Sequence, residues 1–290
     1  MTLDLTSKEM IKALLGEQEA RPLKRFGQNF LISRLILDKI IQAANIKETE
    51  TILEIGSGIG TLTQSLSRKA KKVIAIEKDR KMIEILRKTL KGFKNVEIIE
   101  GDVLGINISG FKFQDSGFKL VANLPFNVAS PTIKKFLEIE NPPEEITVMI
   151  QKEVAERICA KPPKMSILAI SVNFYSQPQI MFFVPKSCFW PRPKVDAAVI
   201  RLKTKKEKAN VDRDLFFRIV KAGFAHPRKQ IINNLALGLA PSQEKKAKLD
   251  KEKVLLWLNE SKIEPQKRAE ALSLKDWLNL TKSFKQFVLK

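Results

Sequence analysis

The sequence has few of the residues that build disulfide frameworks, metal centres and hydrolytic triads. Its 290 residues include two cysteines, one histidine and one tyrosine. Two cysteines do not suggest a disulfide framework, so a reducing cytoplasm is the expected location. The single histidine, His226, argues against a histidine-rich metal site and against a Ser-His-Asp triad. We therefore expect a cytoplasmic protein that needs no metal.

Long hydrophobic runs are also missing. The sequence contains no run of about 18 apolar residues, which is the length of a membrane-spanning helix. The first residues include Asp4 and Glu9 and no small-residue cleavage site, so they do not resemble a secretory signal. We expect no membrane partner.

Acidic residues are scarce in the second half of the chain. Residues 161–290 contain 27 Lys and Arg against 11 Asp and Glu, a net charge of +16, whereas the first 160 residues carry only +4. A polyanionic partner that contacts mainly the C-terminal half explains this asymmetry. A lysine-rich surface that only confers solubility is the alternative.

Strand and helix patterns alternate over the first 150 residues. The predicted strands are residues 51–56, 72–77, 96–102, 119–125 and 146–151. This alternation predicts a parallel, doubly wound α/β sheet. Three more strands are predicted close together, with an antiparallel edge, at residues 167–175, 180–185 and 195–203.

The C-terminal part has a different pattern. Residues 204–209 are polar and basic, as in a linker, and only helical patterns follow from about residue 210. We therefore predict an α/β domain over residues 1–205 and a small all-helical domain over residues 210–290.

A glycine cluster follows the first predicted strand. Gly56, Gly58 and Gly60 let the backbone turn sharply and approach a ligand closely. The spacing differs from the G-x-G-x-x-G pattern of dinucleotide sites, and Glu54 directly before the loop would repel a phosphate. The cluster therefore favours a nucleoside without phosphates and disfavours a nicotinamide dehydrogenase.

Acidic residues stand at the ends of the next two strands. Glu77 lies 21 residues after Gly56, where a carboxylate can bind both ribose hydroxyls. Asp102 ends the third strand and is placed to accept from an adenine amino group. Each acid alone is more often a solvated strand end, but together they predict an adenosine site. The arrangement resembles the Rossmann-like fold of S-adenosylmethionine-dependent methyltransferases, in which the glycine loop would hold the methionyl part.

The fourth strand ends in the sequence NLPF, residues 123–126. The amine of adenine is a poor nucleophile because its lone pair is delocalised into the ring. Two acceptors on the amino hydrogens, the Asn123 side-chain oxygen and the Leu124 carbonyl, would free that pair. Pro125 fixes φ and has no N–H, and Phe126 would stack on the base. A turn with a buried phenylalanine is the alternative reading.

A second ring is expected on the other face of the base, because enzymes that modify a base take it out of the stack. Phe189 and Trp190 are the candidates, in a loop stiffened by Pro191 and Pro193. Packing of this loop against the core is the alternative.

Several long motifs occur in a fixed order along nearly the whole chain. They are KRFGQNFL (24–31), EIGSGIGTLT (54–63), VIAIEKDR (73–80), EGDVL (100–104), NLPFNVASP (123–131), QKEVAERICAKP (151–162), FWPRPKVDAAVIRL (189–202), FAHPRKQIINNL (224–235) and KRAEALSLKDWLNL (267–280). In these motifs the chain resembles the bacterial small-subunit rRNA adenine N6-dimethyltransferases.

The resemblance implies S-adenosylmethionine as the cofactor. The cofactor-binding residues that it implies are Asn29, Leu31, Gly56, Glu77, Asp102 and Asn123, to which we add Gln28 from the same signature and Gly58 from the glycine loop. The catalytic set is Asn123, Leu124, Pro125, Phe126 and Phe189.

The resemblance also implies a substrate. This would be two neighbouring adenosines in the 3′-terminal hairpin loop of 16S rRNA, each methylated twice, in the immature small ribosomal subunit. The helical domain would help to dock a monomeric enzyme on that subunit. The predicted phosphate contacts are Lys194, Lys221, Arg228 and Lys229.

The sequence departs from the family pattern at two places. Phe126 stands where the small-subunit enzymes usually have tyrosine, so stacking is kept and the hydroxyl is dispensable. Residues 161–171 lack the Tyr-Gly pair that commonly follows AKP, which affects fine RNA contacts. A large-subunit adenine methyltransferase of the macrolide-resistance type, or a non-catalytic assembly factor on the same fold, are the alternatives.

Overall fold

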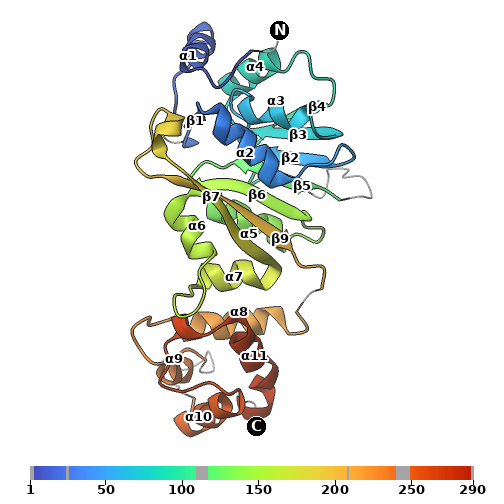
Figure 1. The fold of residues 1–290 in the computed structure, drawn as a ribbon. Coiled ribbons are helices and arrows are strands. Elements are labelled where there is room, and N and C mark those ends of the chain that lie inside the picture. The colour runs from blue at the N-terminus through green and yellow to red at the C-terminus, as the bar shows by residue number, and fades with distance from the viewer. Residues whose placement is uncertain (1–2, 24–25, 109–116, 208, 240–248, 289–290) are drawn as a thin grey trace. The chain divides into compact units, whose positions relative to one another are not determined.

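The computed structural model describes residues 3–23, 26–108, 117–207, 209–239 and 249–288 (Figure 1). The chain forms two compact units. Unit 1 comprises residues 1–156 and 176–204, and unit 2 comprises residues 157–175 and 205–290. In the described ranges, no helix is both long and apolar enough to cross a bilayer.

Unit 1 is built on a seven-stranded sheet with the order β4-β3-β2-β5-β6-β9-β7 (Figure 1). Its strands are β2 (Thr51–Ile55), β3 (Lys72–Glu77), β4 (Val96–Glu100), β5 (Lys119–Asn123), β6 (Glu145–Gln151), β7 (Ser176–Val184) and β9 (Ala197–Thr204). Strands β2 to β6 pair in parallel, and β9 runs antiparallel to both β6 and β7. The predicted α/β fold, with a parallel sheet and an antiparallel edge, is confirmed.

The helices of this part of the chain alternate with the strands. They are α1 (Lys8–Glu17), α2 (Arg34–Ala44), α3 (Thr61–Ser67), α4 (Arg80–Thr89), α5 (Ala129–Glu138) and α6 (Lys152–Ile158). Every residue of β2 is buried, as is typical of a central parallel strand covered on both faces.

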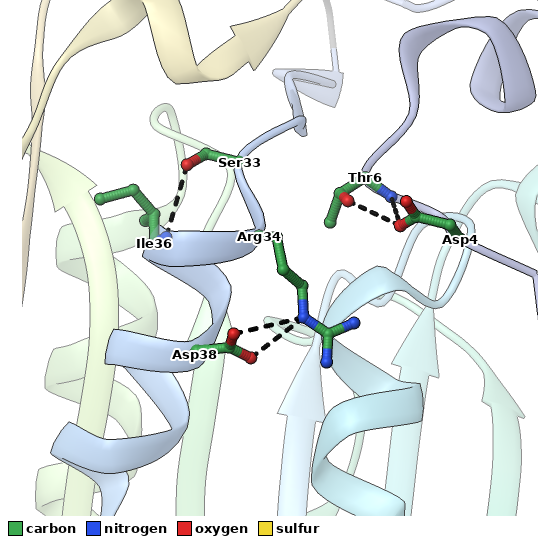
Figure 2. Close-up of polar contacts among 6 residues, drawn as sticks. All are labelled: Asp4, Thr6, Ser33, Arg34, Ile36 and Asp38. Carbon is green, nitrogen blue, oxygen red and sulfur yellow. Dashed lines mark hydrogen bonds and ion pairs between the residues drawn. The ribbon is translucent and has the colours of Figure 1, made fainter.

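The chain before α2 is fixed by local hydrogen bonds (Figure 2). The Ser33 hydroxyl accepts from the Ile36 N–H and caps α2, while Arg34 pairs with Asp38 one turn later. Further upstream, Asp4 Oδ1 accepts from both the N–H and the hydroxyl of Thr6. The cap makes α2 begin directly after β1 (Phe30–Leu31), which pairs antiparallel with β8 (Phe189–Trp190).

Residues 167–175 were expected to form a strand, and this prediction is wrong. They form helix α7 (Ile167–Tyr175), whose start is capped by Ser166 Oγ accepting from the Ala169 N–H. The segment is a continuous apolar run, which by itself does not distinguish a buried strand from a buried helix. Strand β7 begins directly afterwards, at Ser176, four residues before the predicted start.

Unit 2 is a helical bundle around its own apolar core. Its other helices are α8 (Arg213–Gly223), α9 (Ile231–Gly238), α10 (Lys251–Glu260) and α11 (Leu274–Val288). The core contains the fully buried Trp257 and Trp277. Gly223 is required there, because a Cβ at this position would lie 2.3 Å from the ring of Trp277. Residues 157–175 belong to this core, although they were expected in the α/β domain.

Candidate cofactor and target-base site

An open cavity lies in unit 1 at the carboxyl ends of β2, β3 and β5, and its empty space of about 820 Å³ includes open solvent. Ligands of open α/β sheets bind at this edge. The cavity brings together eleven of the predicted site residues, from five separate segments. They are Gln28, Asn29, Leu31, Gly56, Gly58, Glu77, Asn123, Leu124, Pro125, Phe126 and Phe189.

A second cavity, of about 650 Å³, adjoins the first. It is lined by Asp102, Lys78 and Val103, and its wall shares Gly56 and Glu77 with the first cavity. The structure therefore places Asp102 beside the other predicted cofactor residues, in a separate compartment. Two adjoining spaces that share a wall suit an elongated ligand with two chemically different ends.

The glycine loop lies against the predicted catalytic segment, and Gly56 of the loop and Pro125 of the segment line both cavities. Gly56 and Gly58 have φ values of +70° and +56°, which side chains rarely adopt. A Cβ on Gly56 would lie 3.3 Å from Pro125 Cδ. Glycine at this position therefore allows both the turn and the close approach of the loop to Pro125.

Glu77 is held rigidly by backbone donors. Its side-chain Oε2 accepts from the Gly58 N–H at 2.8 Å, and Oε1 accepts from the N–H groups of Lys78 and Asp79 at 2.8 and 2.9 Å. The residue is only 8% exposed. Burial raises its pKa, although the three backbone hydrogen bonds act in the opposite direction. The carboxylate is thus oriented before any ligand arrives.

Asp102 is in a very different environment. It is exposed, and Oδ2 accepts from Lys78 Nζ at 2.7 Å while Oδ1 accepts from the Leu104 N–H at 3.0 Å. The hydrogen bond from Lys78 is the main cause that lowers the pKa of Asp102. Its charge is therefore stabilised by a lysine that also lines the second cavity.

Glu54 is a buried acid of the first cavity, and its position in the sequence predicts only that it repels phosphate. It is 2% exposed and accepts from Thr63 Oγ1 at 2.5 Å. Burial raises the pKa of Glu54 to about 7, and the charge of Glu77 acts in the same direction. A Glu directly before a glycine loop is the sequence signal for such a residue, because the loop covers it.

The segment before β1 is fastened to the start of α4. Gln28 Nε2 donates to Asp79 Oδ2 at 2.7 Å, and Gln28 Oε1 accepts from the Leu23 N–H at 2.7 Å. Lys81 Nζ donates to the Glu19 carbonyl at 2.7 Å. The side-chain amide of Gln28 thus holds the wall of the cavity in place. Asp79 was not predicted, because its partner lies 51 residues away in the sequence.

Two aromatic rings and one amide lie at the predicted catalytic end of the first cavity. Asn123 Nδ2 donates to the Asn29 carbonyl at 3.4 Å, so the side-chain oxygen is the atom of this amide that can accept a hydrogen bond. Phe126 is half-buried and Phe189 is 2% exposed, and both line the cavity. Trp190 instead packs near α1, with Lys12 Nζ 5.9 Å from its ring. Of the two aromatic candidates, the structure brings Phe189 to the site.

The predicted phosphate contacts are all exposed cations. Lys194 lies in unit 1, whereas Lys221, Arg228 and Lys229 lie in unit 2 at and after the end of α8. Across the described ranges, no three His, Cys, Asp or Glu side chains gather into a group that could hold a metal ion.

Comparisons with known proteins agree with this geometry. The family model described as "Ribosomal RNA adenine dimethylase" matches residues 20–286. The chain belongs to the ribosomal RNA adenine dimethylase family. "Ribosomal RNA small subunit methyltransferase A" of Dehalococcoides mccartyi is 40% identical over 93% of this chain and 90% of its own length, and the protein of that name from Bacillus licheniformis is 39% identical over the full length of both.

A solved structure of a dimethylase relative has the same fold. The crystal structure of a dimethyladenosine transferase from Plasmodium falciparum superposes with a TM-score of 0.76 at 30% identity, covering 88% of this chain and 97% of that one. Membership in the dimethylase family confirms the predicted family, the methyltransferase fold and the enzyme class, with S-adenosylmethionine as the cofactor of that class.

Proposed function

We propose that this protein dimethylates N6 of two adjacent adenosines in the 3′-terminal hairpin loop of 16S rRNA, within the immature small ribosomal subunit. One observation carries the proposal: Asn123 and the rings of Phe126 and Phe189 close the same cavity that Glu77 and the glycine loop line. The similarity to proteins named small subunit methyltransferase A supports the choice of the small subunit.

The two connected cavities fit S-adenosylmethionine. Asp102 and Val103 would hold its adenine, Glu77 its ribose, and the backbone of Gly56 and Gly58 its methionyl part. A nucleoside without phosphates suits this site, because Glu54 and Glu77 would repel a phosphate. When bound, S-adenosylmethionine supplies an electrophilic methyl group and leaves as a neutral thioether.

The residues of the catalytic segment prepare the target amine. The Asn123 oxygen and the Leu124 carbonyl would accept the two amino hydrogens, which draws the nitrogen lone pair out of conjugation with the ring. The Leu124 N–H already donates to the Met149 carbonyl at 3.1 Å, and the Val128 N–H donates to the Pro125 carbonyl at 3.0 Å. These bonds fix the turn and so the direction of the Leu124 carbonyl. A preorganised acceptor pair lowers the barrier without reorganisation during the reaction.

Two rings would hold the flipped base. Stacking on one aromatic ring contributes about 1–3 kcal/mol per base, and Phe126 with Phe189 offers one ring for each face. No histidine or other general base is required at the nitrogen, because its proton can leave after methyl transfer.

The basic residues would bind RNA phosphates outside the site. Lys221, Arg228 and Lys229 are exposed in unit 2 and Lys194 in unit 1, and contacts of this kind make binding salt-dependent. We further propose that unit 2 docks a monomeric enzyme on the ribosomal subunit in the cytoplasm.

The experiment that tests the function is Asn123→Ala, assayed on immature small subunits with labelled S-adenosylmethionine. We expect loss of methyl transfer by about 100-fold or more, while subunit binding stays within about twofold of wild type. Arg228→Ala is the matched variant, with weaker subunit binding and intact cofactor binding. Normal turnover by Asn123→Ala would refute the catalytic role of this residue.

Methyl mapping decides between the two ribosomal substrates. We expect dimethyladenosine at the 3′ end of 16S rRNA when the gene is expressed in cells that lack their own enzyme. Dimethyladenosine found only on 23S rRNA would favour the large-subunit reaction instead. Absence of any methylation by a protein that still binds subunits would favour a non-catalytic assembly factor.

A further inference from the structure

Lys135 has an unusual set of partners for a lysine in the last turn of a helix. It lies on α5 and is half-buried. Its Nζ donates to three backbone carbonyls, those of Val103 at 2.8 Å, Leu104 at 3.1 Å and Ile106 at 2.6 Å. All three ammonium hydrogens are therefore directed into one short loop.

That loop is a turn built around Asp102. The Gly105 and Ile106 N–H groups donate to the Asp102 carbonyl at 3.0 and 2.9 Å. The Leu104 N–H donates to Asp102 Oδ1 at 3.0 Å. The same short turn therefore donates N–H groups to Asp102 and accepts hydrogen bonds from Lys135.

The charges of Lys135 and Asp102 also interact. Lys135 is among the groups that lower the pKa of Asp102. Burial lowers the pKa of Lys135, and Asp102 counteracts that effect. Without the ammonium, three carbonyls of the turn would lose their donor and Asp102 would lose a favourable field.

Lys135 also connects the two halves of the candidate site. Helix α5 begins at Ala129, directly after the Asn123–Phe126 segment, and Val103 of the turn lines the second cavity. A bond between this helix and this turn fixes the position of the adenine compartment relative to the target-base compartment.

We propose that Lys135 is a positioning residue for recognition of the cofactor adenine: through the carbonyls of Val103, Leu104 and Ile106 it holds the turn that presents Asp102 to the adenine amino group. The inference rests on the proposed function of the site. It adds a residue that touches neither cofactor nor RNA, and it predicts a selective effect on one part of the cofactor.

The test uses two ligands that differ only at the C6–N1 edge of the base. They are S-adenosylhomocysteine and its deaminated analogue S-inosylhomocysteine, which has a carbonyl at C6 and a hydrogen on N1 and therefore lacks the amino group that Asp102 would bind. Wild-type protein should prefer the adenine ligand by about tenfold in calorimetry, as expected for one hydrogen bond to a charged acceptor. Lys135→Met should lose most of that preference, because adenine affinity falls about tenfold while the affinity for the analogue changes less than about threefold.

Lys119 offers a matched control in the same unit. Its Nζ also donates to backbone carbonyls, those of Asn45 at 2.8 Å and Ala44 at 3.5 Å, and pairs with Glu50 at 3.1 Å. It lines neither cavity. Lys119→Met should lower the melting temperature and leave both affinities and the adenine preference unchanged. Lys135→Arg keeps the charge, but a planar guanidinium cannot direct its donors at the same three carbonyls in the way an ammonium does, so it should lose part of the preference.

The outcomes separate this inference from the proposed function. If wild-type protein binds neither ligand, the assignment of the cofactor fails. If wild type binds and prefers the adenine ligand but Lys135→Met keeps the full preference, the inference is overturned. Equal weakening of both ligands by Lys135→Met also overturns it, because that pattern indicates general loss of structure. If Lys135→Met does not fold, Lys135→Arg decides. A reduced adenine preference in Lys135→Arg supports the role of the three hydrogen bonds. Unchanged affinities for both ligands, together with an unchanged melting temperature, contradict the inference.

Discussion

Glu77 ends β3 and Asp102 follows the end of the neighbouring strand β4, yet their surroundings are opposite. Glu77 is buried, is held by three backbone N–H groups and has a raised pKa. Asp102 is exposed, is paired with Lys78 and has a lowered pKa. Both would bind the same nucleoside. We expect their position at the sheet edge to set where the ligand binds, and their environment to set how much each contributes to its affinity.

The difference follows from what each carboxylate must exchange on binding. Glu77 is already desolvated and is oriented by backbone donors, so a ribose displaces little water from it. Asp102 is exposed and paired with Lys78, so an adenine amino group has to displace water and to displace or share Lys78. A preorganised acceptor gains more than one that trades one partner for another.

Glu77→Ala is expected to have the largest effect on the cofactor. Two charge-assisted hydrogen bonds to ribose are worth about 1.5–3 kcal/mol each, so the affinity for S-adenosylhomocysteine should fall about 150-fold or more by calorimetry. Glu77→Gln keeps the shape and should fall less. Glu97→Ala on β4, which removes an exposed ion pair with Lys72 of β3, is the control. A loss below about threefold for Glu77→Ala would contradict the ribose assignment.

Glu54→Gln tests how a second buried carboxyl affects the stability of the fold. The pKa of Glu54 is raised to about 7 from a model-compound value of 4.5. Between pH 4.5 and 7 the folded state therefore keeps a proton on Glu54 that the unfolded state has released. The free energy of unfolding should therefore fall as pH rises from about 4.5 to 7, by on the order of 2–3 kcal/mol.

The measurement is urea unfolding at several pH values. Glu54→Gln should give a flatter profile than wild type across that window, because glutamine does not ionise. Parallel profiles for the two proteins would show that Glu54 is not protonated in the folded state at these pH values.

Asp102→Ala is expected to have a smaller effect than Glu77→Ala. The adenine contact replaces an existing ion pair, so affinity for S-adenosylhomocysteine should fall only about tenfold. Affinity for S-inosylhomocysteine should hardly change. An effect as large as that of Glu77→Ala would show that the exposed carboxylate is as well preorganised as the buried one, and would remove the contrast.

Most of this site could be predicted from local sequence, because adjacent strand ends of a parallel sheet meet at one edge. Gly56, Glu77, Asp102 and Asn123 each follow a strand pattern, and all four line the two adjoining cavities. The helix at 167–175 was predicted as a strand, since a short apolar run fits either element and packing in unit 2 decides between them.

The residues that support the site could not be predicted in this way. Phe189 and Trp190 are adjacent in a strand and face opposite sides, so the register with β1 decides which one lines the cavity. Lys135 and Asp79 act through partners about 30 and 50 residues away. No short pattern marks them, because their role depends on the tertiary fold alone.

Lys78→Met should produce the smallest effect and tests the exchange of partners directly. Removing the ammonium takes away an exposed ion pair that stabilises the fold by at most about 1 kcal/mol. In wild type this stabilisation is present above the unfolded-state pKa of Asp102 and is lost as pH falls through the lowered folded-state pKa. Because Asp102 then has one partner fewer to displace, affinity for S-adenosylhomocysteine should stay within about threefold of wild type and shift toward tighter binding. Calorimetry at neutral pH measures this change, with Arg80→Met, which breaks the neighbouring exposed pair with Glu100, as the control. A tenfold loss of affinity in Lys78→Met alone would mean that the lysine contacts the cofactor itself, and that Asp102 binds adenine with the lysine in place.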